Sequence, residues 1–424
     1  MCNGYAGVTT RFLRQDERLI LSEENEMPLV IEAKDSTNVS FLQSFLASHS
    51  SDLINDISNY GAILLRGFDV SSDEDFEKTI LSVQGFQGIS EAFMSEQGRI
   101  HVGNLKYVLH TNAVYKTGGT LYLGGFHSEN YYTPDVPTYI CFCCLKPSVR
   151  GGETGLVNME KVFPLLDDDL KKRLEKNTFF VSKWLMTEVA ERYQLSTAAV
   201  EKICEQFDLP VIGNGNKKFI LMYKPSIFEH PLTKKKALAI NLFEIPNLNE
   251  EMRKCFNHDY KGNAWFWHRF VWKLPKFIFS ILEFIYVVFA SILYSPIESV
   301  KIIRSKFYFH KAWNKKHNLP KFNNVKVGTC FNDNDVKNLA KLIRNYYSSC
   351  LWKKGDILLI DNRKVMHAGM PGSGQRLIRA MICNPIEMKY SFAKPGHLDC
   401  KNRTTETIGF YMNSGIFDAE VYEG

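Results

Sequence analysis

The sequence lacks the separated cysteine pairs from which structural zinc sites and disulfide frameworks are built. Its 424 residues include ten cysteines, and only Cys141, Cys143 and Cys144 lie close together. A zinc site in a chain of this length usually takes its ligands from two such groups. Because alternate residues of a strand face the same side, Cys141 and Cys143 are expected on one face as small core residues. The pattern therefore predicts that the cysteines are reduced and that they pack as core residues.

Long runs of one charge, internal repeats and low-complexity tracts are also absent. The 52 lysines and arginines and the 46 acidic residues leave a net charge of +6, which is spread thinly along the chain. Because no basic stripe is visible, we expect no nucleic-acid partner. The first residues show no basic and apolar targeting pattern, so the expected location is the cytoplasm. With 45% apolar residues, the composition is that of a globular protein.

One segment departs from this even composition. Residues 277–294 contain a single charged side chain, Glu283, and tryptophans and basic residues flank this run within and beside the stretch 265–303. Its length makes the run a marginal candidate for a membrane span. Its flanks are typical of a helix or hairpin that lies at a membrane surface. A helical pair that is buried on the core or on a second subunit would have the same composition.

The pattern along the chain indicates an α+β protein. A strand-rich middle and end, with helices packed outside, favours an antiparallel β core. Apolar residues at helical spacing predict helices at 38–58, 73–83, 162–175 and 185–207, the last as one helix or a pair. Short apolar runs predict strands at 62–65, 107–109, 120–125, 138–145, 219–223, 237–243, 357–360 and 377–383.

Two segments carry residues that could bind a metal ion. His127 and Glu129 are separated by one residue, so on an extended strand their side chains would project to the same side. His367 follows the apolar run 357–360 and the polar stretch Asp361-Asn362-Arg363. Two histidines and one carboxylate make the facial triad that holds Fe(II) and leaves positions open for other ligands. A lone His-x-Glu pattern also occurs on surfaces and in cores, so the surrounding residues decide its meaning.

Residues suited to a dicarboxylate follow each of these segments. The stretch Gly151-Gly152-Glu153-Thr154 comes after the His127 segment, and Arg376 lies nine residues beyond His367, across a glycine-rich hairpin. An arginine guanidinium can hold a distal carboxylate through two hydrogen bonds, and a threonine hydroxyl can assist it. This is the equipment for a dicarboxylate that also chelates iron.

With these motifs in order, the chain resembles the taurine dioxygenase and clavaminate synthase-like superfamily of Fe(II)/2-oxoglutarate-dependent oxygenases. The likeness covers residues 29–250 and 325–390. The glutamate in the His-x-Glu motif makes the chain most similar to the amino-acid hydroxylases of the clavaminate synthase type. Further matching motifs are Gly61-Ala62-Ile63-Leu64-Leu65-Arg66-Gly67-Phe68, His230-Pro231-Leu232-Thr233, and Trp352 with Gly355-Asp356.

The resemblance implies a double-stranded β-helix, or jelly-roll, core with flanking helices. It implies His127, Glu129 and His367 as iron ligands, and Thr154 and Arg376 as the residues that hold 2-oxoglutarate. The expected reaction uses O2 and 2-oxoglutarate to hydroxylate an unactivated C–H bond of a small molecule, with release of succinate and CO2. Desaturation or cyclisation remains an alternative outcome of the same chemistry.

The arginine assignment has an alternative, because many relatives carry two arginines four residues apart on this strand. Here Arg376 and Arg379 are three apart, so they project from opposite faces and only one can point inward. The spacing from His367 favours Arg376. We expect Arg66 to be structural. Residues expected to line the substrate pocket, or else to serve the structure, are Tyr131, Tyr132 and Asn241.

The surplus length relative to the family is an insertion at 255–322, which contains the apolar run. A single membrane crossing there would place His127 and His367 on opposite sides of the bilayer, and the iron site could not form. We therefore expect one oxygenase domain over 1–424. Within it, the stretch 265–303 would be a lid, a contact between two copies of the chain, or a peripheral membrane element.

The expected substrate is amino-acid-like or a small amine, either free or attached to a carrier protein. A membrane-peripheral oxygenase that acts on a lipid-like substrate is an alternative, since the apolar insertion would serve it as a docking device. A non-catalytic scaffold of the same fold is a weaker alternative, because it would have no need of the metal ligands and the arginine together.

Overall fold

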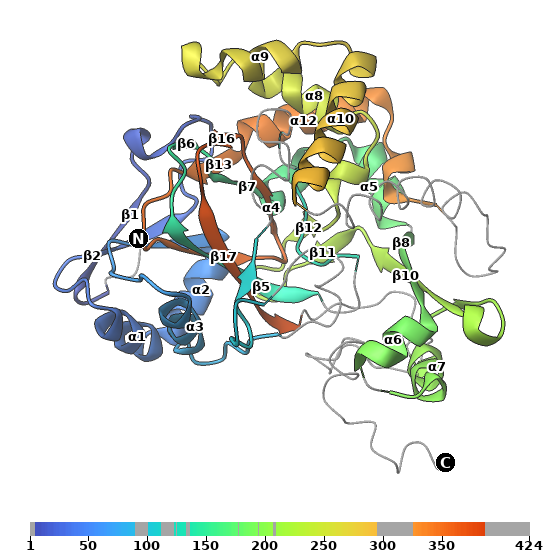
Figure 1. The fold of residues 1–424 in the computed structure, drawn as a ribbon, viewed down its shortest axis with the longest axis horizontal. Coiled ribbons are helices and arrows are strands. Elements are labelled where there is room, and N and C mark those ends of the chain that lie inside the picture. Colours follow the sequence, from blue (N-terminus) through green and yellow to red (C-terminus); the bar gives the residue numbers. More distant parts are fainter. Residues whose placement is uncertain are drawn as a thin grey trace.

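The computed structural model of the chain describes residues 5–89, 101–111, 123, 125–132, 136–176, 178–193, 195–206, 209–294 and 325–385. Two β-sheets form its centre, and helices lie outside them (Figure 1). This is the mixed architecture of helices and mainly antiparallel strands that the sequence predicts. The strand predicted at 120–125 lies outside the described residues, except for Leu123 and Gly125.

The larger sheet has seven strands and joins segments from both ends of the chain. Neighbouring strands pair antiparallel, except for β2 and β3, which are parallel. The apolar run of β14 is buried on both faces, which explains why it lacks the alternation of a half-exposed strand. In sheet order the strands are β1 (Val8–Phe12), β2 (Leu29–Ala33), β3 (Ala62–Arg66), β14 (Ile357–Asp361), β5 (Pro137–Lys146), β17 (Leu377–Pro385) and β4 (Leu109–His110).

A smaller, antiparallel sheet packs against one face of the larger one. The buried cluster between them contains Leu64 and Phe142 from the larger sheet and Leu156 and Val365 from the smaller one. The two sheets therefore close on a single apolar layer, as in a sandwich or jelly roll. In order the strands of the smaller sheet are β13 (Tyr347–Cys350), β7 (Thr154–Asn158) and β15 (Val365–Gly369).

Three helices cover the outer face of the larger sheet. Cys141 and Cys143 point to this face and are buried with the helices' apolar residues, as the cysteine pattern predicts. The prediction of one helix over 38–58 is wrong, because the chain leaves the helical conformation at His49. The His49 ring and the Ser50 hydroxyl bond to carbonyls of the preceding turn, which is how such side chains interrupt a helix. The helices are α1 (Val39–Ser48), α2 (Ser50–Tyr60) and α3 (Asp73–Leu81).

The other elements lie around the smaller sheet and beyond it. The helix predicted over 162–175 is interrupted, since Pro164 lies in a 3-10 turn and the Asp167 side chain caps a new helix. The pair predicted at 185–207 is confirmed as α6 and α7. These helices are α4 (Met159–Val162), α5 (Asp168–Glu175), α6 (Met186–Tyr193), α7 (Thr197–Gln206), α8 (Leu248–Phe256) and α12 (Asp333–Asn345). The remaining strands are β8 (Thr178–Leu185), β10 (Phe219–Pro225), β9 (Val211–Ile212), β11 (Ile227–Glu229), β12 (Lys236–Leu238), β6 (Arg150–Gly151) and β16 (Gly372–Ser373).

The apolar stretch forms two helices, α9 (Phe266–Trp272) and α10 (Lys276–Tyr294), at the top of Figure 1. Trp265, just before α9, packs on the glycine-rich loop of the core: a Cβ at Gly151 would lie 2.6 Å from its ring. Within the described part of the chain, no helix is long and apolar enough to cross a membrane. The part of the expected insertion that follows Tyr294 lies outside the described residues.

Arg66 is structural, as the sequence predicts. Its buried guanidinium on β3 forms ion pairs with Asp356 at 2.6 Å and with Glu17 at 2.9 Å. Burial alone would lower the pKa of Arg66, but the two carboxylates hold it well above its usual range. This network fixes the start of β14, the strand that leads to the candidate site.

Candidate functional site

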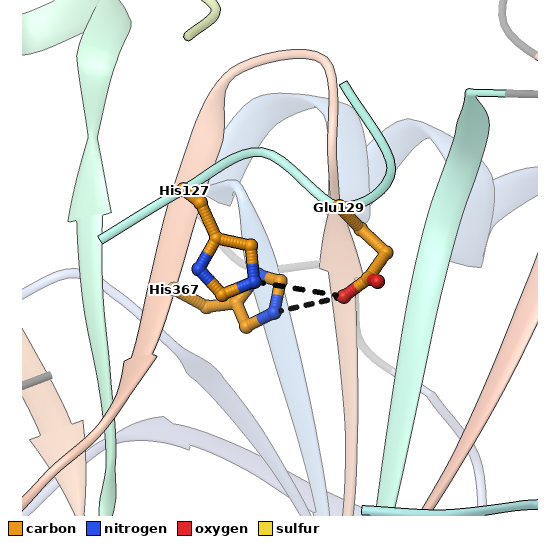
Figure 2. A group of neighbouring side chains, drawn as sticks. All are labelled: His127, Glu129 and His367. Carbon is orange, nitrogen blue, oxygen red and sulfur yellow. Dashed lines mark ion pairs between the residues drawn. The ribbon is translucent and has the colours of Figure 1, made fainter. Parts of the chain in front are cut away.

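His127, Glu129 and His367 come together at one side of the inter-sheet layer (Figure 2). One carboxylate oxygen, Glu129 Oε2, lies 3.3 Å from His367 Nε2 and 3.8 Å from His127 Nε2. Within this group, ligand atoms from all three residues lie within 4.8 Å of one another. Glu129 and His367 are buried, and His127 is partly exposed. The three residues could therefore hold one metal ion with a side open to a substrate.

The two histidines are joined through their backbones. The His127 amide donates to the His367 carbonyl at 3.2 Å, and the His367 amide donates to the His127 carbonyl at 3.1 Å. Within 127–129 only His127 pairs as a strand residue, and a turn begins at Glu129, with Asn130 at a φ of 54°. The predicted convergence of the His127 and Glu129 side chains occurs without a continuous strand (Figure 2).

The hydrogen bond of the His127 imidazole leaves a lone pair on its other ring nitrogen, near the carboxylate. His127 Nδ1 lies 2.7 Å from the Gly125 carbonyl, which can only accept, so Nδ1 carries the proton and Nε2 presents a lone pair. Both ring nitrogens of His367 are buried, and neither has a hydrogen-bond partner among the described residues. Two lone-pair nitrogens beside a carboxylate form a set of ligand atoms that suits a divalent cation. The residues present thus fit Fe(II).

Asn362 holds the backbone of Glu129 in place, a role that the sequence did not reveal. Its Oδ1 accepts from the Glu129 amide at 2.6 Å, and its Nδ2 donates to the Glu129 carbonyl at 3.2 Å and to the Pro137 carbonyl at 2.8 Å. The only signal in the sequence is the position of Asn362 in the polar stretch between β14 and β15. An amide side chain that pairs with a backbone amide and carbonyl fixes the chain direction at the carboxylate.

A buried ion-pair network anchors Asn362 in turn. Asp361 accepts from His230 Nε2 at 2.8 Å and from Arg363 at 2.7 Å. His230 Nδ1 accepts from the amides of the following turn, so its proton lies on Nε2, toward Asp361. Burial alone would raise the pKa of Asp361, but Arg363 and His230 hold it well below its usual range. These contacts make His230 part of the scaffold that supports the site.

Thr154 and Arg376 lie at the mouth of the inter-sheet layer. Thr154 pairs with Gly369 on β15, two residues beyond His367, so Thr154 and His367 face the interior together. Arg376 Nη1 donates to the Gly152 carbonyl, two residues before Thr154. Burial lowers the pKa of Arg376, yet the guanidinium stays charged at neutral pH. A dicarboxylate that reaches the triad would therefore find a hydroxyl and a cation from these two residues.

Arg379 projects to the other side of β17. Its guanidinium bonds to Asp73 of α3 at 2.6 Å and contacts His110 at 2.8 Å. These partners lie on the face that α1 to α3 cover. Arg376 precedes β17 and a register shift lies between the two arginines, so their three-residue spacing does not by itself explain their different surroundings. The structure brings Arg376 and not Arg379 next to the glycine-rich loop.

Glu153 is a buried carboxyl beside this loop. Its Oε1 accepts from the Tyr347 hydroxyl at 3.4 Å, and its Oε2 has no hydrogen-bond partner among the described residues. Burial raises the pKa of Glu153 to about 7, although nearby Arg376 opposes the shift. The side chain therefore titrates near neutral pH, next to the residues that could hold the dicarboxylate.

The three residues expected to line the substrate pocket have different surroundings. Tyr131 is a buried core residue whose hydroxyl donates to the Pro225 carbonyl. Tyr132 is partly buried, and its carbonyl accepts from Ser182 at 2.6 Å. Asn241 forms a backbone bridge with His127, and its Oδ1 has no hydrogen-bond partner among the described residues. Of the three, Asn241 is the residue that the backbone pairing places beside the triad.

Two aromatic rings that no sequence motif singled out flank the imidazoles. Phe142 on β5 lies 5.3 Å from the His367 ring, between centroids. Phe243 lies 6.2 Å from the His127 ring and is 46% exposed. Phe142 thus makes one wall of the site apolar, and Phe243 forms an edge that a substrate could contact.

Comparison with known proteins gives relatives of one kind. Dapdiamide synthesis protein DdaC of Enterobacter agglomerans is 22% identical over 368 residues, which are 83% of this chain and 90% of that protein. PvcB of Pseudomonas aeruginosa has 10% sequence identity and a TM-score of 0.44, with 90% of this chain and 92% of that chain covered. A taurine dioxygenase of Burkholderia xenovorans has 10% identity and a TM-score of 0.42, with 92% and 94% covered.

The family comparison is more decisive. The model of the taurine catabolism dioxygenase TauD, TfdA family matches residues 25–253, more than half of the chain. The match includes His127 and Glu129, and the fold adds His367 from outside it. The chain therefore belongs to the TauD, TfdA family, and it is an enzyme of the Fe(II)- and 2-oxoglutarate-dependent dioxygenase type.

Proposed function

We propose that this enzyme hydroxylates an unactivated C–H bond of a small amino-acid-like or amine substrate, with conversion of 2-oxoglutarate to succinate and CO2. The observation that carries the proposal is the group of two imidazoles and one carboxylate, whose ligand atoms lie within 4.8 Å of one another. In the proposal His127, Glu129 and His367 hold Fe(II). Iron supplies the activation of O2 when it is bound.

The remaining residues of the site position the co-substrate. Arg376, which the Gly152 carbonyl orients, binds the distal carboxylate of 2-oxoglutarate, and the Thr154 hydroxyl donates to the same group. Asn362 keeps the Glu129 backbone fixed, so the carboxylate does not have to be ordered when the metal arrives. Phe142 and the apolar layer between the sheets exclude water from one side of the reacting centre.

The substrate class follows from the edge of the site and from the relative. Asn241 and the partly exposed Phe243 lie beside His127, so they are the first groups that a substrate meets. The likeness to DdaC, a dapdiamide synthesis protein, favours a small molecule of biosynthetic origin, free or attached to a carrier. A lipid-like substrate is the second candidate, because the apolar side chains of α9 and α10 are exposed.

The proposed organisation is one oxygenase domain in which the described part of the 255–322 insertion, residues 255–294, lies outside the sheets. A backbone β-bridge joins His127 and His367, and the insertion lies between these two residues in the sequence. A boundary between two independent domains anywhere between residues 127 and 367 would separate the ligands.

Succinate formation by the purified protein, supplied with Fe(II) and 2-oxoglutarate, tests the reaction. Candidate amino acids, amines and lipids are added one at a time, and the true substrate class should raise the rate. His367→Ala should weaken iron binding at least about 100-fold and abolish turnover. His258→Ala, which changes an exposed histidine, is the matched control. Iron content and succinate formation that survive His367→Ala would show that the ligand assignment is wrong.

A further inference from the structure

The exposed apolar side chains of the molecule are concentrated on α9 and α10. Nine of the 17 large hydrophobic residues that are exposed in the described part of the chain lie between Phe266 and Phe289. Trp267 is 66% exposed, Phe277 76% and Phe289 62%. On α10, Phe277, Ile281 and Phe284 follow one another at intervals of four and three residues, so they share one helical face. Apolar patches of this kind mark interaction surfaces.

The opposite side of the same segment is firmly attached to the core. Trp265, Trp272 and Phe279 are each less than 5% exposed. The Arg253 guanidinium of α8 lies 3.7 Å from the centroid of the Phe279 ring, and the Trp265 ring lies against Gly151. The exposed face is therefore the outer side of α9 and α10, whose inner side is already buried against the core.

The charges around this face are of one sign. Lys261, Lys273 and Lys276 are exposed at the ends of the two helices. The single acidic residue between 260 and 294, Glu283, is only partly exposed, and its charge acts on Arg253 at the core. An apolar aromatic face with a cationic rim is complementary to a bilayer that carries anionic headgroups.

We propose that this face of α9 and α10 binds the surface of an anionic lipid bilayer, with the two helices lying in the interface. Aromatic rings enter the headgroup and upper acyl region, and the lysines contact lipid phosphates. A second copy of the chain fits less well, because a two-fold contact through this face would bring the lysines of both copies together. The proposal does not depend on the reaction or on the metal.

Co-flotation of the full chain with vesicles tests the proposal. Phosphatidylcholine vesicles that contain phosphatidylglycerol should bind the protein, and vesicles of phosphatidylcholine alone should bind it roughly tenfold or more weakly. Phe266→Ser, Trp267→Ser and Phe270→Ser together should lower binding roughly 100-fold. Lys273→Glu with Lys276→Glu should remove the preference for anionic vesicles. Leu165→Ser with Leu232→Ser, at two exposed apolar positions elsewhere, should change nothing.

Several outcomes would overturn the proposal. One is failure of the wild-type protein to float with any vesicle. Another is unchanged flotation of the variant with three serine substitutions while its circular dichroism spectrum is native. A protein that is dimeric without vesicles, and that the serine substitutions make monomeric, would show that the face joins two copies instead. Succinate formation in solution, measured on the same variants, should stay at the wild-type rate and separates this test from that of the reaction.

Discussion

The candidate site and the α9–α10 segment both depart from the usual arrangement of apolar side chains inside and charged side chains outside. Around the site, charged groups lie inside: Arg66, Asp361 and Lys364 are all buried, and each has an oppositely charged partner. On α9 and α10, aromatic groups such as Trp267 lie outside. The first arrangement supplies its own partners and fixes a geometry. The second leaves apolar side chains exposed among the described residues, which is the pattern of an interaction surface.

The buried network should show its importance most clearly when one charge is removed. Arg66→Met would leave Asp356 buried without its main partner, and we expect a loss of about 3–5 kcal/mol in the free energy of unfolding. Urea denaturation of both proteins measures it. Lys236→Ala, which removes an exposed pair with Glu175, should cost no more than about 1 kcal/mol. Equal losses in the free energy of unfolding would contradict the expectation that the buried ion pair contributes more to stability than the exposed one.

Burial raises the pKa of Glu153, so this side chain should make the free energy of unfolding depend on pH. Its folded pKa of about 7 exceeds the unfolded value of 4.5, so the folded state keeps the proton longer. Stability should therefore fall as the pH rises from 4.5 to about 7, by about 3 kcal/mol in all.

Glu153→Gln should remove this dependence, because the amide does not titrate. Urea denaturation at about pH 5 and about pH 8 gives the two values for each protein. The free energy of unfolding of Glu153→Gln should rise relative to that of the wild type as the pH rises. A constant difference between the two proteins across this range would mean that Glu153 finds a partner when it ionises.

Asn362 tests whether the buried polar groups act on the metal ligands. Asn362→Ala removes the hydrogen bonds to the Glu129 amide and carbonyl, and we expect iron to bind about 10–100-fold more weakly. Titration with Fe(II) under anaerobic conditions measures the change, and Asn338→Ala, at an exposed asparagine, is the control. Unchanged affinity in Asn362→Ala would make the residue a purely structural one.

The smallest effect is expected on the outer face of α9. Phe270→Ala should change the free energy of unfolding by no more than about 0.5 kcal/mol, since the ring is 50% exposed. Phe279→Ala, on the buried side of α10, should cost at least about 2 kcal/mol. Thermal unfolding of both variants gives the comparison. A large loss for Phe270→Ala would mean that the outer face already has a partner within the chain.

The strands of the core could be predicted from the sequence because they are buried on both faces. The apolar runs of β5, β14 and β17 exceed what a loop or an exposed helix would carry, and their predicted positions agree with the structure to within a few residues. Such features depend on local sequence alone.

The features that escaped prediction depend on the particular hydrogen bonds and contacts that a side chain makes, either within one helical turn or with a distant part of the chain. The helix break at His49 comes from side chains that compete for backbone carbonyls, against an apolar spacing that continues through it. Asn362 resembles any turn asparagine until Glu129 is placed beside it. The exposed face of α10 has the same composition as a buried one. The hydrophobicity of the sequence therefore does not show which face of the helix packs on the rest of the chain.

The backbone bridge between His127 and His367 also has a consequence for the order of events in the cell. The two histidines are 367 − 127 = 240 residues apart in the sequence. A nascent chain that lacks β15 has neither the second imidazole nor the strand that pairs with the first. On the proposed ligand assignment, the complete set of ligands therefore forms only after β15 has been synthesised.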